Sequence, residues 1–369
     1  MKVLLFWGLL GATVVQLLFW GGVVGRLLFR RQRRFSPEEK KLPPCTVLLC
    51  ARDEADNLRK NLPRILNQNY HCFEVLVIIH NSRDDSEKVL ADLQRTYPQL
   101  RYERLDTPPS QVGKKIPLSK GIARARHPVL LLTDADCRPA SRHWMRRMME
   151  PFAEGAEVVL GVSPFEERPG LLNRFIRFEG FYTAIQYLGF ARLGLPYMGV
   201  GRNLAYRKNL FERVGGFAGH ENLPSGDDDL LVSAFFRARA RFALVTDPES
   251  YTFSPTKTTL LDYYRQKTRH LSTSTRYLPG HQVLLGAVSA SHFLHYALLL
   301  PAALFIGGPF AAMCYAVRLS LVWSLCISVL NNMSFKNIGS WVPLLDALMI
   351  AYYVILAPSI TFRNTKKWK

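Results

Sequence analysis

The stretch Val129–Ser141, which reads VLLLTDADCRPAS, runs a short apolar segment directly into two carboxylates. Its first five residues are aliphatic or β-branched, the composition of a buried β-strand. Asp134 and Asp136 follow, separated by one alanine. Two interpretations fit this Asp-x-Asp: a turn that ends the strand, or a site for a hard cation such as Mg²⁺ or Mn²⁺, which prefers carboxylate oxygens. The surrounding sequence has to decide between them.

Strand-like and helix-like segments alternate around this stretch. Short β-rich runs at Cys45–Ala51, Glu74–His80 and Leu100–Leu105 are separated by segments whose apolar residues have helical spacing. Strands that alternate with helices of these lengths indicate βαβ units and predict an α/β domain with a mostly parallel sheet. Ligands of such sheets bind at the carboxyl ends of the strands, where Asp134 and Asp136 lie. This location favours the cation site.

The phosphate-binding motifs of nucleotide enzymes are missing from the sequence. No G-x-G-x-x-G follows the first strand and there is no Walker A motif, so phosphates would have to meet metal and basic side chains. Lys114 and Lys115, in QVGKKIPLSKG, precede a predicted helix and are the candidates. A lysine pair is also common on solvated surface, and that interpretation stays open.

A second acidic cluster, Asp227, Asp228 and Asp229, begins an apolar helical pattern in LPSGDDDLLVSAFF. Acidic residues in a first helical turn suit the helix dipole. Three adjacent carboxylates also repel one another, which should raise the pKa of at least one of them. A carboxylate of that kind can act as a general base toward a hydroxyl. The two clusters together indicate a transferase that acts on an activated phosphate ester.

Apolar segments at both ends of the chain predict an integral membrane protein. Val3–Phe29 has no charged residue up to Gly25 and ends in a basic run, which favours a retained anchor over a cleaved signal peptide. Three further segments, Val283–Gly308, Phe310–Leu330 and Trp341–Phe362, are each near spanning length. We therefore expect an anchor at 1–29, a catalytic domain with interfacial helices at 30–280, and two to three spans at 281–369.

The positive-inside rule orients this arrangement. Arginines at positions 30, 31, 33 and 34 follow the first span and predict a cytoplasmic domain. The basic tail RNTKKWK also favours the cytoplasm, although three full crossings would place it outside, so one C-terminal segment could be re-entrant or interfacial. The net charge of +19 comes without a nucleic-acid-binding motif, and it suits anionic lipid and phosphate-bearing substrates instead. We expect no nucleic-acid partner.

Two further segments combine aromatic and basic residues and predict helices at the bilayer surface. They are Leu171–Gly194 and Leu260–Leu278. In the second, Gln266, Arg269 and His270 share one helical face, which could contact either lipid headgroups or an acceptor.

Taken in order, six motifs resemble those of the membrane-bound family 2 glycosyltransferases, which have an inverting GT-A fold. The motifs are ARDEADNL, GKKIPLSKGI, TDADC, GVGRNLAYRKNLFERVGGF, GDDD and QKTRH. The resemblance covers roughly residues 46–277, and its specificity comes from the order and spacing of the motifs. It implies that a sugar passes from a nucleotide-diphospho-sugar to an acceptor hydroxyl with inversion at the anomeric carbon.

The resemblance also implies roles for individual residues. Mg²⁺ or Mn²⁺ on Asp134 and Asp136 would hold the diphosphate, and Asp228, with Asp227 beside it, would be the catalytic base. The remaining donor contacts would be Ala51, Arg52, Glu54, Lys114, Lys115 and again Asp134. The acceptor would meet Gly201, Asn203, Gln266, Arg269 and His270.

Two departures from the family pattern affect specificity. Ile79 and His80 stand where the family often has an acidic pair, which leaves the choice of nucleotide open, and His270 replaces the usual tryptophan. With few C-terminal spans, transfer of one sugar to a membrane lipid or lipid-linked acceptor fits better than polymer synthesis. The alternatives are a processive polysaccharide synthase, a non-catalytic nucleotide-binding membrane scaffold, and a nucleotidyl- or lipid-phosphate transferase.

Overall fold

A computed structural model of the protein describes residues 1–28, 42–108, 113–221, 223, 225–333, 335 and 337–361. The chain divides into two compact units. The sheet unit comprises residues 34–166, 196–257 and 364–369, and the helical unit comprises residues 1–33, 167–195 and 258–363. The arginines at 30–34 and the basic tail, on which the predicted orientation rests, lie outside the described residues.

A seven-stranded sheet forms the centre of the sheet unit, in the order β3-β2-β1-β4-β7-β6-β8. Its strands are β1 Cys45–Ala51, β2 Phe73–His80, β3 Leu100–Leu105, β4 Val129–Leu132, β6 Val158–Leu160, β7 Leu204–Arg207 and β8 Phe242–Leu244. Only β7 runs antiparallel to its neighbours β4 and β6, so the predicted mostly parallel α/β fold is confirmed. A separate ribbon pairs β5 Arg138–Pro139 with β9 Thr252–Phe253.

The register of the parallel strands brings their carboxyl ends to one edge. Cys45 is level with Phe73 on one side and with Val129 on the other, so β1, β2 and β4 run in step. The loops that follow these three strands therefore leave the sheet together. Arg52 and Glu54 lie on the loop after β1, and Asp134 and Asp136 on the turn after β4, whereas Lys114 and Lys115 lie at the start of α4.

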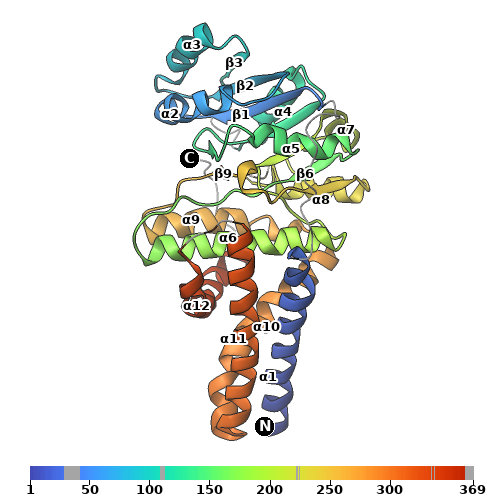
Figure 1. The fold of residues 1–369 in the computed structure, drawn as a ribbon, viewed down its shortest axis with the longest axis vertical. Coiled ribbons are helices and arrows are strands. Elements are labelled where there is room, and N and C mark those ends of the chain that lie inside the picture. The colour runs from blue at the N-terminus through green and yellow to red at the C-terminus, as the bar shows by residue number, and fades with distance from the viewer. Residues whose placement is uncertain are drawn as a thin grey trace. The chain divides into compact units, whose positions relative to one another are not determined.

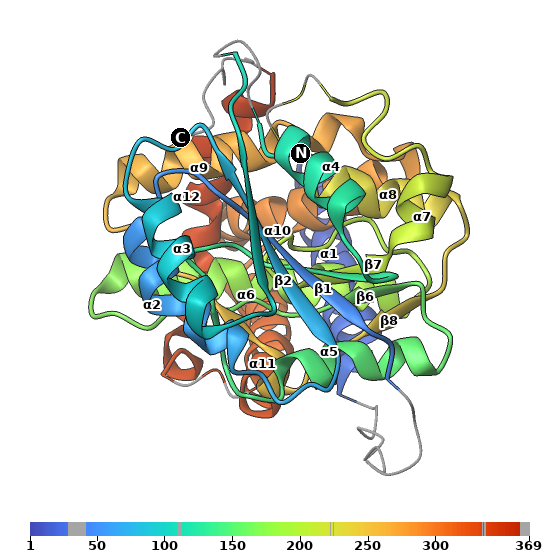
Figure 2. The same ribbon diagram turned by 90° about the horizontal axis from the view of Figure 1, so that it is seen from above.

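Helices cover both faces of the central strands, which explains why β1 and β4 are buried along their whole length. Figure 2 shows α2 Ala55–Leu66 and α3 Ser86–Thr96 on one side of β1 and β2, and α4 Lys115–Arg124 on the other. Side chains alternate accordingly, with Val47 and Leu49 in the core shared with α2 and α5 Trp144–Ala153. On the other face α4 lies so close that a Cβ at Gly121 would come 2.4 Å from Leu48 Cδ1.

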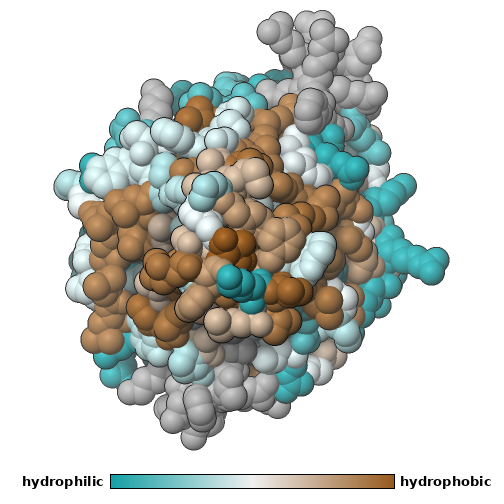
Figure 3. Space-filling model, turned by 90° about the horizontal axis from the view of Figure 1, so that it is seen from below, coloured by the Kyte–Doolittle hydropathy of each residue, from teal (hydrophilic) through white to brown (hydrophobic). Residues whose placement is uncertain are grey.

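Within the part that the structure describes, the helical unit has four helices long and apolar enough to cross a membrane. These spans are Lys2–Leu27, Pro279–Phe305, Gly308–Asn332 and Gly339–Ser359. They contain α1 Lys2–Leu17, α10 Pro279–Phe305, α11 Gly308–Asn332 and most of α12 Val342–Thr361. The face of the molecule where three of these helices end is mainly hydrophobic (Figure 3). These features support the predicted membrane association.

Two further helices belong to the helical unit. α6 Leu171–Arg192 and α9 Leu260–Leu271 lie across one end of α1, α10 and α11 (Figure 1). Both come from segments that the sequence predicts to be interfacial, and Leu260 and Leu261 of α9 are exposed. Their contacts group them with the apolar helices. The predicted domain boundaries at residues 29/30 and 280/281 remain a prediction.

A buried polar network joins the four long helices. Arg318 of α11 and Asp346 of α12 form an ion pair at 2.6 Å, and both side chains are fully buried. Arg318 also donates to Gln16 Oε1 in α1 at 3.0 Å, and the Tyr296 hydroxyl of α10 donates to Asp346 at 2.7 Å. Because polar groups away from water must be satisfied internally, these contacts tie all four helices together.

Candidate active site

The turn after β4 gathers the predicted metal ligands. The backbone N–H of Cys137 donates to the Asp134 carbonyl at 3.0 Å, which folds Asp134–Cys137 into a tight turn, and Asn61 of α2 donates to the Ala135 carbonyl. Potential ligand atoms of Asp134, Asp136 and Cys137 lie within 4.8 Å of one another. The two carboxylates are the ligand type that Mg²⁺ and Mn²⁺ prefer, and the buried thiol is not. The residues present thus fit a hard divalent cation.

The electrostatics of this turn favour a cation. Burial raises the pKa of Asp136, and the carboxylates of Asp134 and Glu54 raise it further, against a smaller opposing effect of Arg202. A carboxylate under this repulsion is stabilised when positive charge binds beside it. Glu54, predicted from the resemblance to contact the donor, is therefore close enough to act on Asp136.

Lys114 links the two acidic clusters. Its ammonium pairs with Asp134. Burial opposes its charge, but the carboxylates of Asp134 and Asp227 raise the pKa of Lys114 above its usual range. The two clusters, about ninety residues apart in the sequence, therefore share one cation in the sheet unit.

Asp228 caps the N-terminus of α8 Asp229–Arg237. Its Oδ1 accepts from the Asp229 N–H and its Oδ2 from the Gly201 N–H, both at 2.8 Å. A Cβ at position 201 would lie 3.4 Å from Asp228 Oδ2, so glycine allows this close approach. Burial, Asp227 and Asp229 raise the pKa of Asp228 to about 7, and the two N–H groups oppose that rise. A carboxyl group with this pKa can accept a proton near neutral pH.

The loops after β1 and β2 are held together beside the turn after β4. The Asp53 N–H donates to Ser82 Oγ at 3.0 Å, and Asp53 Oδ1 accepts from the Arg83 N–H at 2.7 Å. Asp84 accepts from the Ala55 N–H at 2.8 Å, which fixes the start of α2. Of the predicted donor residues, Ala51 ends β1, and Arg52 and Glu54 lie on the loop that these hydrogen bonds hold.

His80, at the end of β2, is buried and bonded within the protein. One ring nitrogen, Nε2, lies 2.8 Å from Thr107 Oγ1, and burial followed by the charge of Arg52 lowers the pKa of His80. His80, one of the two residues in place of the family's acidic pair, is therefore a neutral imidazole buried at the end of β2.

Asn203 and Lys115, two of the predicted site residues, are buried and hydrogen-bonded to backbone carbonyls. Asn203 is fully buried, its amide donates to the carbonyls of Val162 and Ser250 at 2.8 Å, and its Oδ1 accepts from Trp144 Nε1 at 2.9 Å. These contacts favour a structural role over the expected acceptor contact. Lys115 is buried too, and its ammonium donates to backbone carbonyls rather than facing an open phosphate site.

Gln266, Arg269 and His270 lie on α9 of the helical unit, whereas both acidic clusters lie in the sheet unit. Gln266 and Arg269 are half-buried and His270 is exposed. Their neighbour Lys267 points inward and pairs with the buried Glu179 of α6, which also accepts from the Tyr263 hydroxyl at 3.1 Å. This buried pair determines which face of α9 is turned away from α6.

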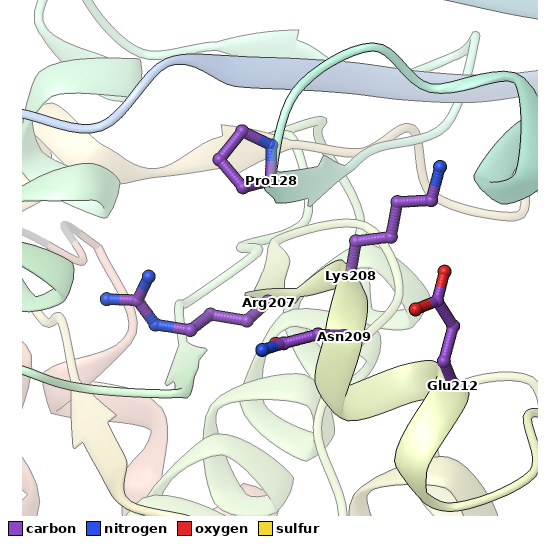
Figure 4. A pocket seen from close by; sticks show the side chains of 5 residues that line it. All are labelled: Pro128, Arg207, Lys208, Asn209 and Glu212. Atoms are coloured by element: carbon purple, nitrogen blue, oxygen red, sulfur yellow. The ribbon is translucent and has the colours of Figure 1, made fainter.

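A small surface pocket, shown in Figure 4, lies at the wrong end of the strands to be the site. It is lined by Pro128, Arg207, Lys208, Asn209 and Glu212. Pro128 precedes β4, whereas Asp134 follows it. Its two cations are already bonded to backbone carbonyls of α5 and α4 and the residues that follow them.

Comparison with known proteins assigns the chain to a family. The profile of glycosyl transferase family 21 matches residues 10–367. The chain belongs to this family. The resemblance to family 2 was thus correct at the level of a GT-A-like glycosyltransferase, while the family that matches is family 21. The prediction of an enzyme of the glycosyltransferase class is confirmed.

Individual relatives of this family 21 chain are distant. The probable glycosyltransferase YdaM of Bacillus subtilis is 24% identical over 263 residues, 68% of this chain and 60% of that protein. The beta-monoglucosyldiacylglycerol synthase of Nostoc sp. is 29% identical over 144 residues, 37% of this chain and 30% of that protein. This chain therefore spans less than two thirds of the length of either relative.

One solved structure matches the fold over nearly the whole chain. It is the mannosyltransferase PcManGT from Pyrobaculum calidifontis in complex with GDP-Man and Mn²⁺, with a TM-score of 0.60 and 19% identity over 98% of both chains. At this identity the likeness establishes the α/β, GT-A-like fold alone.

Sequence reasoning missed one charged residue of this family 21 site. Arg202 acts electrostatically on Asp136, and its guanidinium stacks over the Phe165 ring at 4.7 Å from the centroid. The available signal was its position between Gly201 and Asn203 in GVGRN, both of which were assigned to the site. An arginine in that loop is close enough to the acidic turn to respond to a bound anion.

Proposed function

We propose that this chain is an inverting glycosyltransferase that moves a sugar from a nucleotide-diphospho-sugar to a hydroxyl of a membrane lipid or lipid-linked acceptor. One observation carries the proposal: the sheet unit has two acidic clusters in different electrostatic environments, linked by Lys114. Asp134 and Asp136, at the end of β4, form a carboxylate pair that fits a divalent cation. The Asp228 carboxyl, which caps α8, has instead a pKa of about 7.

In the proposed reaction Asp228 accepts the proton of the acceptor hydroxyl. The hydroxyl oxygen attacks the anomeric carbon from the face opposite the nucleotide, a new C–O bond forms, and the bond to the diphosphate breaks. The electron pair leaves with the nucleoside diphosphate, and the configuration at the anomeric carbon inverts. Lys114, which pairs with Asp134, and Arg202, which acts on Asp136, orient the diphosphate. Mg²⁺ or Mn²⁺, when bound at Asp134 and Asp136, neutralises charge on the leaving diphosphate.

Substrate class and location are supported by several separate observations. The solved mannosyltransferase is in complex with GDP-Man and Mn²⁺, and one relative is named for a diacylglycerol glycolipid product. The four apolar helices support an acceptor within the bilayer. We place the catalytic domain on the cytoplasmic side, as the arginines at 30–34 predict. We assign Gln266, Arg269 and His270 to the acceptor as the resemblance implies.

The metal-dependent donor site gives the first test. Without its cation the diphosphate would face unpaired carboxylates, so EDTA or Asp136→Ala should abolish the thermal stabilisation that a panel of nucleotide sugars produces with Mn²⁺. Asp56→Ala is the matched control, because the side chain of Asp56 is 99% exposed. Product analysis against membrane lipids then identifies the acceptor and shows whether one sugar or a polymer is formed.

Donor binding that is indifferent to both EDTA and Asp136→Ala would contradict the metal assignment. Release of pyrophosphate or a nucleoside monophosphate, instead of a nucleoside diphosphate, would show a nucleotidyl- or phosphate transferase.

A further inference from the structure

Lys115 occupies a position that is unfavourable for a lysine. It is the first residue of α4, where the helix dipole disfavours positive charge, and its exposed fraction is only 4%. Burial lowers the pKa of Lys115 despite the nearby carboxylates, so the net effect of its surroundings is to disfavour the charged ammonium. Among the described residues no carboxylate lies within ion-pair distance of its ammonium. Specific hydrogen bonds must therefore stabilise this arrangement.

Those hydrogen bonds lead to the loop in front of the proposed base. Lys115 Nζ donates to the carbonyls of Leu223 at 2.7 Å and Ser225 at 2.5 Å. Ser225 is followed by Gly226, whose φ of 95° turns the chain into the acidic cluster. Two of the three ammonium protons are thus used on the backbone that delivers Asp228 to the start of α8.

The neighbouring lysine makes this contact more significant. Lys114 pairs with Asp134 at the predicted metal corner, and Lys115 holds the loop before Asp228. Adjacent residues at the start of α4 therefore contact one acidic cluster and the loop that leads into the other. The carboxylates at 227–229 and Glu221 also act on Lys115 at longer range, so its charge balances theirs.

We propose that Lys115 is a positioning residue that ties the loop before Asp228 to α4 and so fixes the base relative to the donor side of the site. The inference rests on the proposed function for its catalytic consequence, but the tether itself does not depend on that function. The sequence predicts a phosphate contact for Lys115. The positioning role replaces that contact and agrees with the burial and the hydrogen bonds of this residue.

The test compares Lys115→Met, which keeps most of the side-chain stem, with Lys120→Met. Lys120 lies on the same helix and pairs with Glu103 near the surface, so its variant has the same net charge. Hydrogen exchange of the amides of Leu223 and of residues 225–231 should rise in Lys115→Met and stay unchanged in Lys120→Met. Transfer should fall roughly 10–100-fold, as a misplacement of about 1 Å can cause. Donor affinity should stay within about threefold, since Lys115 makes no donor contact.

Other outcomes separate the alternatives. A large loss of donor affinity without faster exchange would overturn the proposal and restore the phosphate role. Faster exchange in Lys115→Met, in a protein that transfers no sugar from any nucleotide donor even as wild type, would uphold the tether and reject the proposed function. Should Lys115→Met fail to fold, Lys115→Gln, which retains two N–H donors, and Lys115→Arg, which retains the charge, take its place. Wild-type exchange rates and normal transfer in Lys115→Arg but not in Lys115→Gln would show that charge alone matters, and would contradict the tether.

Discussion

Asp228 illustrates how the local environment alters a common side chain. In water an aspartate is ionised well below neutral pH, but burial beside two further carboxylates raises the pKa of this one to about 7. The Gly201 and Asp229 N–H groups hold both of its oxygens, so the carboxyl is oriented as well as tuned. An oriented carboxyl that titrates near neutral pH is well suited to take a proton from a hydroxyl.

Asp228→Asn should therefore abolish most transfer while leaving donor affinity nearly unchanged. The amide keeps the size of the side chain but cannot accept the proton, and loss of a general base typically costs about 10²–10⁴-fold in rate. In the wild type the rate should rise with pH and level off above about 7, because only the ionised form is active. Steady-state rates and donor affinity of wild type, Asp228→Asn and the exposed control Asp92→Asn test this. A rate within about tenfold of wild type would assign the base to another group.

The same raised pKa predicts an effect on stability. The folded state binds the Asp228 proton more tightly than the unfolded state, so this group's stabilising contribution is present below the unfolded pKa and is lost as pH rises toward about 7. Asp228→Asn should then raise the melting temperature more at pH 8 than at pH 5. Thermal unfolding at the two pH values, without added metal, is the measurement, and equal shifts at both would contradict the raised pKa.

At the scale of elements, the helical unit depends on buried charges as well as apolar surface. Arg318, Asp346, Gln16 and Tyr296 come from four different long helices and contact one another away from water. Truncating one partner of such a pair leaves a buried charge unpaired, whereas replacing both with apolar residues removes two charges together.

Arg318→Met should thus destabilise the protein by about 3–5 kcal/mol, because Asp346 loses its guanidinium partner, although the His292 ring remains at 3.3 Å. The double variant Arg318→Met/Asp346→Leu should recover much of that loss. Thermal unfolding of the detergent-solubilised protein measures both, with the exposed Met313→Leu on the same helix as control. If the double variant is as unstable as the single one, the network is needed for its hydrogen bonds and not merely for charge balance.

At the scale of the whole molecule, the chain combines a sheet unit rich in charged side chains with a helical unit that presents apolar surface. The proposed reaction needs a water-soluble nucleotide donor and a lipid-soluble acceptor, and this division of the chain suits both. The predicted cytoplasmic side of the sheet unit can be tested with the chain's own cysteines. Cys72 in the sheet unit is exposed, whereas the other five cysteines are buried.

A membrane-impermeant maleimide should therefore label Cys72 only after the cells are permeabilised, because the sheet unit faces the cytoplasm in our proposal. Cys72→Ser supplies the control, since it removes the accessible thiol and should abolish the signal. Labelling of intact cells that disappears in Cys72→Ser would place the sheet unit outside and reverse the predicted orientation.

Much of the fold was predictable because its signals are local. The runs Cys45–Ala51 and Leu100–Leu105 are strands in the structure with the predicted bounds. Four apolar segments near spanning length were likewise evident from composition, and each corresponds to a long apolar helix in the structure. Such elements follow from the backbone preferences and the hydrophobicity of neighbouring residues, which one sequence window contains in full.

The antiparallel strand β7 was not predicted. Leu204–Arg207 is too short to be recognised without its partners β4 and β6. The three residues of β6, Val158–Leu160, likewise form a strand only by pairing with β7 and β8. Pairing between distant segments decides both cases.

The candidate site shows the same limit. Residue types and motif order were sufficient to select both acidic clusters and Lys114 from the sequence. Only tertiary structure turned Lys115 and Asn203 inward onto backbone carbonyls and brought Arg202 near Asp136. The physical reason is that a side chain's chemical type is a property of the residue, whereas its burial, partners and pKa depend on groups that the chain supplies from elsewhere.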